Sequence, residues 1–250
     1  MKIIEFGNKN NKKIILIHGL SMPYQIFDRL IDNYVTEYHI IIPILSGHDI
    51  SSDDTLLSVK NESLKIKEFI LKQTNEIYMI IGVSLGAAVA LSLLEDNVIT
   101  TKYLILESGI YKRFSSILLA ISRKIEVSTL NKIKKRDEKT INTFTKMFGD
   151  TFKYFFDLAD NMNDNTIINA VSSFKNYKIA STLNLNNTNI IVFQGTSLDF
   201  SVRKSTKLLR KRFNNVYIKT FKKYHHCELS VNRPDEFIDE IELAIKNFNS

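Results

Sequence analysis

The chain has 250 residues, 44% of them hydrophobic, which allows one α/β domain or two smaller domains with a sizeable core. Its formal net charge is +7, but its lysines are dispersed among many asparagines, without an arginine-rich helix or an aromatic-interleaved basic patch, so we expect no nucleic-acid partner. The single cysteine excludes an intramolecular disulfide. The sequence has no signal-peptide pattern, and no apolar run approaches the roughly 20 residues that a membrane span needs. We therefore expect a soluble cytoplasmic protein without stable membrane insertion.

The first part of the chain alternates short apolar runs with stretches of helical periodicity. Runs rich in β-branched residues and leucine predict buried strands, and apolar residues spaced three or four apart predict helices. In chain order we expect strands at 2–6, 14–17, 38–42, 77–81 and 102–106, with Pro43 ending the third, and helices at 24–34, within 57–74 and at 87–94. This alternation predicts an α/β fold, a mostly parallel sheet with helices on both faces.

Residues 110–185 break this rhythm. The segment is helical by pattern and carries basic stretches and several phenylalanines. We interpret it as a helical cap inserted into an α/β core formed by residues 1–109 and 186–250; the alternative is a second, independent helical domain. After it we expect strands at 190–193 and 216–221 and helices at 202–213 and 237–248, the last opened by a proline and acidic residues, as helix starts prefer.

The stretch 78–94 holds a G-x-S-x-G pattern between a predicted strand and a predicted helix, formed by Gly82, Ser84 and Gly86. In a nucleophile elbow the serine occupies a sharp turn near the left-handed region, and the flanking glycines leave room because they lack a Cβ atom. Amides at the start of the following helix then face negative charge that develops beside the serine. The alternative interpretation is a glycine-serine turn without chemistry.

Polar residues suited to acyl transfer follow three of the predicted strands. Ser84, Asp199 and the pair His225/His226 each come just after the carboxyl end of a strand, where open α/β sheets form ligand sites. A serine hydroxyl needs a base to take its proton, histidine is suited to this near neutral pH, and a carboxylate fixes the tautomer of the histidine. The order serine, aspartate, histidine is the order that accompanies this elbow pattern.

With these residues in place, the chain resembles the α/β-hydrolase fold over nearly its whole length. Further matching pieces are His18-Gly19 after an early strand, Ser46-Gly47-His48 in the next loop, Gly195 ahead of Asp199, and the segment 226–230 ahead of Arg233-Pro234. Asp49 stands where proteins of this fold usually have a glycine, and Ala87-Ala88 stands where a second glycine is common.

The resemblance implies roles for individual residues. Ser84 would be the nucleophile, Asp199 the acid and His226 the base. The backbone N–H groups of Leu20 and Leu85 would form the oxyanion hole, with Ser21 as the runner-up for the Leu20 amide. The 110–185 insertion would correspond to the helical cap that shapes the acyl or leaving-group pocket.

Several assignments stay open at this point. His225 is the alternative base, and Glu107, which ends the strand after the elbow, is the alternative acid. Cys227 adjoins the base without any elbow context, so we expect a buried and inert thiol. His18 is expected to orient its own loop, whereas His48 would either line the pocket or bond to backbone; His39 opens a strand and suggests no role.

We therefore expect a cofactor-independent serine hydrolase that cleaves a small-molecule carboxylic ester or thioester through an acyl-enzyme. No residue cluster has the spacing of metal ligands, so no metal is expected. The substrate's acyl chain and the oligomeric state are left open. Alternatives are a peptidase or carbon–carbon bond hydrolase of the same fold and a non-catalytic ligand-binding member. A dinucleotide site is disfavoured because Ser84 and Ala87 occupy glycine positions of the G-x-G-x-x-G fingerprint.

Overall fold

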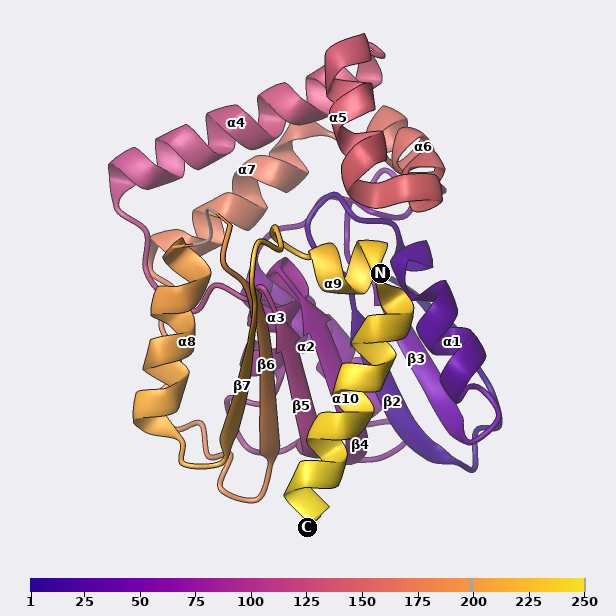
Figure 1. Cartoon of the computed structure of the whole chain (residues 1–250), viewed down its shortest axis with the longest axis vertical. Coiled ribbons are helices and arrows are strands. Elements are labelled where there is room, and N and C mark those ends of the chain that lie inside the picture. The colour runs from indigo at the N-terminus through magenta and orange to yellow at the C-terminus, as the bar shows by residue number, and fades with distance from the viewer. Residues whose placement is uncertain (198–199, 250) are drawn as a thin grey trace.

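A seven-stranded sheet forms the centre of the structure, a computed structural model that describes residues 1–197 and 200–249, with only the backbone described at positions 147 and 150. The strand order is β1-β3-β2-β4-β5-β6-β7 (Figure 1). The strands are β1 (Lys2–Phe6), β2 (Lys12–Ile17), β3 (Tyr38–Ile44), β4 (Glu76–Val83), β5 (Thr100–Glu107), β6 (Asn189–Gly195) and β7 (Val216–Phe221). β1 pairs antiparallel with β3, and every other neighbouring pair is parallel, which confirms the predicted α/β class.

Helices cover both faces of this sheet. Those of the α/β part are η1 (Tyr24–Phe27), α1 (Asp28–Tyr34), α2 (Val59–Ile70), α3 (Leu85–Leu93), α8 (Phe200–Arg212), α9 (Glu228–Asn232) and α10 (Pro234–Asn249). The pair α2 and α3 packs on one face, and the pair α1 and α10 packs on the other (Figure 1). The Arg29 guanidinium of α1 donates to the Asp235 carboxylate of α10 at 2.6 Å. Both apolar faces of the parallel strands are thereby covered, as a parallel sheet requires.

The third strand runs past Pro43, where the sequence predicts its end. Pairing of β3 with β2 stops at Ile41, so Pro43 needs a partner on one side only, where it lies opposite Ile3 of the antiparallel strand β1. A proline lacks the N–H that a central strand position would use, but it fits a position that is paired on one side. The predicted end of this strand is therefore wrong by two residues.

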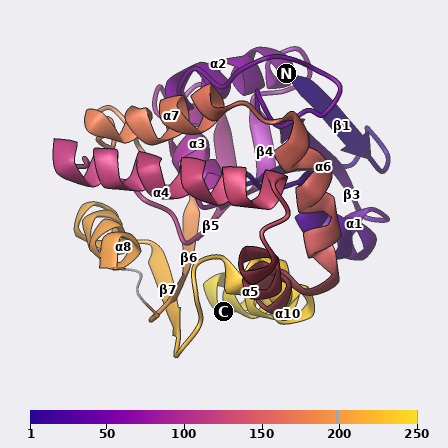
Figure 2. The ribbon, with the colours of Figure 1, turned by 90° about the horizontal axis from the view of Figure 1, so that it is seen from above.

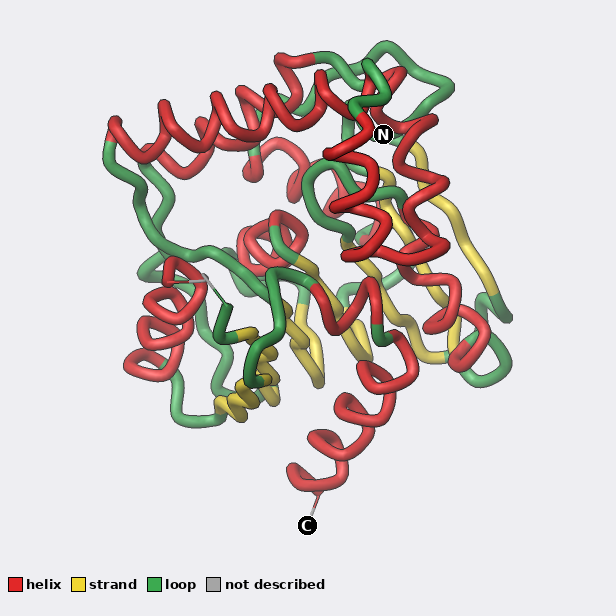
Figure 3. The backbone as a smooth tube through the Cα atoms, turned by 45° about the horizontal axis from the view of Figure 1, so that its top comes forward, coloured by secondary structure: helices red, strands yellow, loops and turns green. Residues whose placement is uncertain are grey.

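The helices between β5 and β6 lie across the edge of the sheet where the parallel strands end. They are α4 (Ser116–Lys134), α5 (Glu138–Phe148), η2 (Gly149–Phe152), α6 (Lys153–Asn161), α7 (Asp164–Ser172) and η3 (Ser173–Lys175). Seen from above, α4 and α7 run side by side, with α5 and α6 beyond them (Figure 2). The loops that leave the strands lie between the sheet and these helices (Figure 3). Helices α4–α7 consequently cover any site that those loops form.

The interior of the sheet is apolar. The four residues Ile14–Ile17 of β2 are fully buried, as are Ile80 and Ile81 of β4 and Leu104–Leu106 of β5. Across the described residues, no helix combines the length and apolar character needed to pass through a bilayer.

Candidate active site

Ser84 occupies a sharp turn between β4 and α3. Its backbone has φ 52° and ψ −112°, a left-handed conformation that costs a non-glycine residue energy and persists only where the surroundings enforce it. A Cβ at Gly82 would lie 2.6 Å from the Gly86 oxygen, and a Cβ at Gly86 would lie 2.1 Å from the Ile17 oxygen. These glycines are therefore needed for the close approach of β2, β4 and α3, which the elbow pattern predicted.

The Ser84 hydroxyl meets the imidazole of His226 across 142 positions of sequence. Ser84 Oγ lies 2.8 Å from His226 Nε2. A neutral His226 ring that accepts the serine proton at Nε2 carries its own proton on Nδ1. The neighbouring His225 is exposed, and its backbone N–H donates to the Glu228 carboxylate at 2.9 Å. Of the two candidate histidines, His226 is thus the one in contact with Ser84.

The loop that carries His226 is fastened on both sides. A Cβ at Gly195 would lie 2.1 Å from the Tyr224 oxygen, so the end of β6 and this loop touch backbone to backbone. The N–H of Cys227 donates to Ser108 Oγ at 3.0 Å, and the Cys227 side chain is fully buried, as expected. Both Cys227 and Ser108 adopt positive φ angles, so strained backbone extends from the elbow to the histidine loop.

Glu107, the alternative acid, is buried beneath this loop. Its carboxylate accepts the backbone N–H of Leu229 at 3.1 Å and that of Ser230 at 3.1 Å, both in the first turn of α9. Burial raises the pKa of Glu107 to about 7, although the Ser230 hydrogen bonds, the His226 ring and the Leu229 amide all oppose the rise. The carboxylate therefore anchors the helix that follows His226, and short helix α9 was not predicted from the sequence.

Asp199, the acid implied by the resemblance, lies outside the described residues. The segment before it contacts the histidine loop: Ser197 N donates to the Tyr224 oxygen at 3.1 Å, and Ser197 Oγ donates to the Lys223 oxygen at 2.9 Å. The partner of His226 Nδ1 stays a prediction.

Two buried histidines shape the loop after β2. His18 Nε2 accepts the Leu45 N–H at 3.1 Å, and His48 Nε2 accepts the Ser21 N–H at 2.9 Å. Desolvation lowers the pKa of His18 to about 4 and that of His48 to about 3, so both rings are neutral near pH 7. His18 therefore orients its loop as expected, and of the two possibilities for His48 the structure shows the bond to backbone.

The N–H groups of Leu20 and Ser21, in the loop after β2, are the two candidates for the partner of Leu85 in the predicted oxyanion hole. The Ser21 N–H is already used by His48. Among the described residues, the N–H of Leu20 in the loop after β2 and that of Leu85 in the first turn of α3 have no backbone acceptor, and both residues line the same cavity as Ser84. This favours Leu20 over Ser21 as the partner of Leu85.

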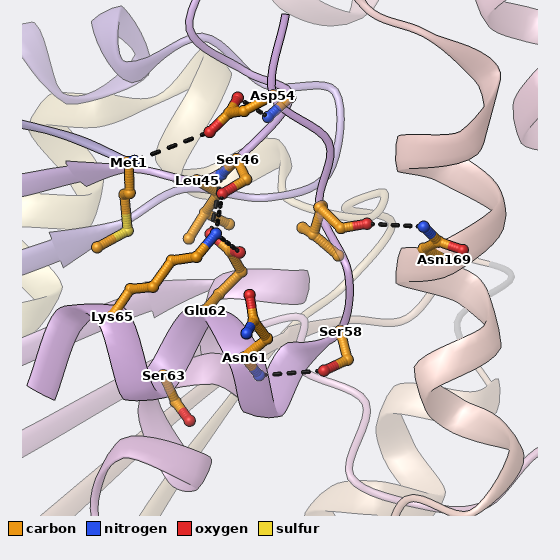
Figure 4. A network of polar contacts seen from close by, with 12 residues as sticks. Met1, Leu45, Ser46, Asp54, Ser58, Asn61, Glu62, Ser63, Lys65 and Asn169 are labelled. Atoms are coloured by element: carbon orange, nitrogen blue, oxygen red, sulfur yellow. Dashed lines mark hydrogen bonds and ion pairs between the residues drawn. The ribbon is translucent and has the colours of Figure 1, made fainter.

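A polar network supports the His48 loop from below (Figure 4). The fully buried carboxylate of Glu62 accepts the Ser46 N–H at 2.8 Å, and Lys65 donates to both Ser46 Oγ and Glu62. Farther along, Asn169 of α7 donates to the Leu56 oxygen at 3.0 Å. Helix α2 and the covering helix α7 thereby hold this loop between them.

A cavity of about 670 Å³ opens between Ser84 and the covering helices. Most of its wall is apolar. Six phenylalanines contribute: Phe114, Phe144, Phe148, Phe155, Phe174 and Phe200. Its polar wall residues include Ser122, Glu126 and Thr129 of α4, which the sequence analysis did not single out. Their spacing of three and four residues along a predicted helix is the signal that would have found them.

No group of three or more histidine, cysteine, aspartate or glutamate side chains suited to a metal ion occurs in residues 1–197 and 200–249. The arrangement found there offers a strained serine beside an imidazole, two amides facing the cavity and a largely apolar chamber. These are the parts that acyl transfer needs.

Comparison with known proteins adds a result on the fold. No sequence-family model and no curated protein sequence matches the chain. Among solved structures, a Desulfitobacterium hafniense protein assigned to the α/β hydrolase family superposes with a TM-score of 0.78 at 20% identity, covering 98% of this chain and all (100%) of that one. A structure from a study of carboxylesterases of the thaumarchaeon Nitrososphaera gargenis gives 0.77 at 14% identity, with coverages of 100% and 96%.

An esterase from Exiguobacterium antarcticum is similar as well, with a TM-score of 0.73, 14% identity and coverages of 98% and 94%. Each match covers 98% or more of this chain, so the likeness extends to both the sheet and the covering helices. This chain therefore has the α/β-hydrolase fold that its motifs predicted.

Proposed function

We propose that the protein is a serine hydrolase that cleaves a carboxylic ester or thioester of a small molecule. The observation that carries the proposal is the 2.8 Å contact between Ser84 Oγ and His226 Nε2 at the floor of a largely apolar cavity. Support comes also from similar structures, whose descriptions name carboxylesterases and an esterase.

In the proposed reaction, Ser84 Oγ bonds to the substrate carbonyl carbon while its proton passes to His226 Nε2. The backbone N–H groups of Leu20 and Leu85 receive the negative charge that forms on the carbonyl oxygen. When the tetrahedral intermediate collapses, the bond to the leaving oxygen or sulfur breaks and His226 returns the proton to that group. Water, deprotonated by His226, then attacks the acyl-enzyme; the bond between the acyl carbon and Ser84 Oγ breaks, the acid leaves and His226 returns the proton to Ser84 Oγ.

Asp199 is our proposed partner for His226 Nδ1, with Glu107 as the alternative. Glu107 already accepts two amides of α9, and desolvation disfavours its charge, so it is poorly suited to stabilise an imidazolium. Asp199→Asn should lower kcat by several orders of magnitude if Asp199 holds the tautomer of His226, whereas Glu107→Gln should retain most activity.

The helices of the 110–185 segment serve in this proposal as a cap over the acyl or leaving group. Their phenylalanines supply an apolar wall for a hydrocarbon acyl chain. Neither the chain nor the phenylalanine rings give up hydrogen bonds with water when they come into contact.

The test is turnover of p-nitrophenyl esters and acyl thioesters of graded chain length. We expect Ser84→Ala and His226→Ala to abolish turnover and His225→Ala to leave it nearly unchanged. A greater loss in His225→Ala than in His226→Ala would refute the assignment of the base, and full turnover by Ser84→Ala would refute the nucleophile.

A further inference from the structure

One acidic side chain projects into the cavity from the covering helix α4. Glu126 lines the same chamber as Ser84 and His226. Ser122 and Thr129, one turn before and after it, line the chamber too, so a polar stripe faces the reacting serine. Among the described residues of the wall, none is a lysine or arginine.

The opposite face of α4 makes this placement unusual. Ile117, Ile121 and Ile125 are exposed by 75%, 50% and 57% on the outside of the helix. A glutamate with no role in the cavity would be expected on that outer, solvent-facing side, and isoleucines on the inner side. Glu126 is itself an exposed residue, but it lines the chamber together with Ile133 of the same helix, whereas Ile117, Ile121 and Ile125 face the outside.

The Glu126 side chain is exposed to the space of the chamber, and it has no hydrogen bond and no ion pair with any other described residue. The surrounding protein raises its pKa by desolvation, and the His226 imidazole opposes that rise. A cation placed beside the carboxylate would offset the same desolvation.

The rest of the wall also suits a cation. Phenylalanine faces attract ammonium groups through their ring quadrupole, and a carboxylate together with aromatic faces forms a cage for such a group. An anionic substrate group would meet Glu126 and find no lysine or arginine in the described wall. A purely hydrocarbon chain would displace water from the carboxylate without offering it a hydrogen bond or a charge.

Resting on the proposed function, the geometry points to Glu126 as a specificity-determining residue that selects esters carrying an ammonium group, which it binds together with the phenylalanines of the cavity. The ammonium group would lie several bonds from the scissile carbonyl, in either the acyl or the alcohol part.

The test compares isosteric substrates. Choline butyrate is paired with the ester in which a tert-butyl group replaces the trimethylammonium, and a second pair places the same two groups at the end of the acyl chain of a p-nitrophenyl ester. We expect the wild-type protein to favour the cationic member of at least one pair by about tenfold in kcat/KM, most of it from the charge of Glu126 and the rest from the phenylalanine faces.

Glu126→Gln should remove most of this preference, so that the ratio of kcat/KM for the cationic ester to kcat/KM for its neutral partner falls to within about twofold of one. Glu138→Gln is the matched control, because Glu138 is an exposed acid in the neighbouring helix α5 outside the cavity wall, and it should behave as wild type. An equal preference in wild type and Glu126→Gln, or none in wild type, would overturn the inference.

A binding measurement separates this inference from the proposed function. Calorimetric titration with phenyltrimethylammonium should show binding to wild type and to Ser84→Ala, and at least roughly fivefold weaker binding to Glu126→Gln. If no ester is turned over but this difference holds, the proposed function fails and the ammonium site stands. If esters are turned over and phenyltrimethylammonium binds equally to all three proteins, the ammonium site fails alone.

Discussion

Replacing Glu107 by glutamine is expected to change how the stability of the protein depends on pH. The carboxyl is 2% exposed, and burial raises its pKa from the ordinary 4.5 to about 7. The folded protein therefore keeps this proton up to about pH 7, whereas the unfolded chain releases it near 4.5. Between these values the folded state binds more protons, so the contribution of Glu107 to the free energy of unfolding falls as the pH rises.

The size of the effect follows from the shift. Across both pKa values, the contribution of Glu107 to the free energy of unfolding falls by roughly 3 kcal/mol, and about 2 kcal/mol of this fall occurs between about pH 5 and pH 7.5. Glutamine has the same shape, keeps an oxygen for the α9 amides and does not titrate. Relative to wild type, Glu107→Gln should thus gain about 2 kcal/mol of stability between the two pH values.

Urea unfolding followed by far-ultraviolet circular dichroism measures this difference, because the chain has no tryptophan to report by fluorescence. His18 and His48 have lowered pKa values, so their contributions rise with pH in part of the same window, but they are common to both proteins and cancel in the difference. Glu37→Gln, the same change in an exposed side chain, is the control. A difference between Glu107→Gln and wild type that stays constant with pH would refute the account of this carboxyl.

Three further predictions concern contacts around the site. Gly86→Ala would place a methyl group 2.1 Å from the Ile17 oxygen, so we expect a loss of about 2–4 kcal/mol in urea unfolding, and near wild-type stability would show that the elbow is not tightly packed. Gly195→Ala would push against the Tyr224 oxygen and displace the His226 loop, which should reduce kcat at least about tenfold with p-nitrophenyl butyrate, and unchanged kcat would contradict this. His48→Phe removes the acceptor of the Ser21 N–H, so the free energy of unfolding should drop by about 1–3 kcal/mol, and an unchanged urea midpoint would show that this bond contributes nothing.

Local signals were sufficient to predict the sheet and the elbow. Composition alone predicts buried strands at Ile14–Ile17 and in the run before Ser84. The elbow was predicted from the fixed spacing of Gly82 and Gly86 around the serine. The choice of His226 over His225 came from the resemblance, because proteins of this fold place the base just before a short segment that leads to the final helix, which Pro234 opens here.

What sequence patterns could not provide are contacts between residues far apart in the chain. The bonds of Glu107 to the amides of α9 join positions more than 120 apart, and helix α9 itself has five residues, too few for a periodic signal. The end of β3 was predicted too early because Pro43 is paired with β1 only. Whether a position of β3 is paired on one side or on both depends on where β2 ends, and the composition of β3 does not reveal that. The choice between His48 as a pocket residue and as a backbone acceptor needed the position of the Ser21 N–H.

Covalent trapping of the nucleophile tests the central claim most directly. The intact mass of the protein after reaction with a fluorophosphonate, followed by peptide mapping, reports how many groups are attached and where. We predict a single adduct on Ser84, formed by wild type, lost in Ser84→Ala and slowed strongly in His226→Ala. An adduct on another residue, or labelling that persists in Ser84→Ala, would contradict the account.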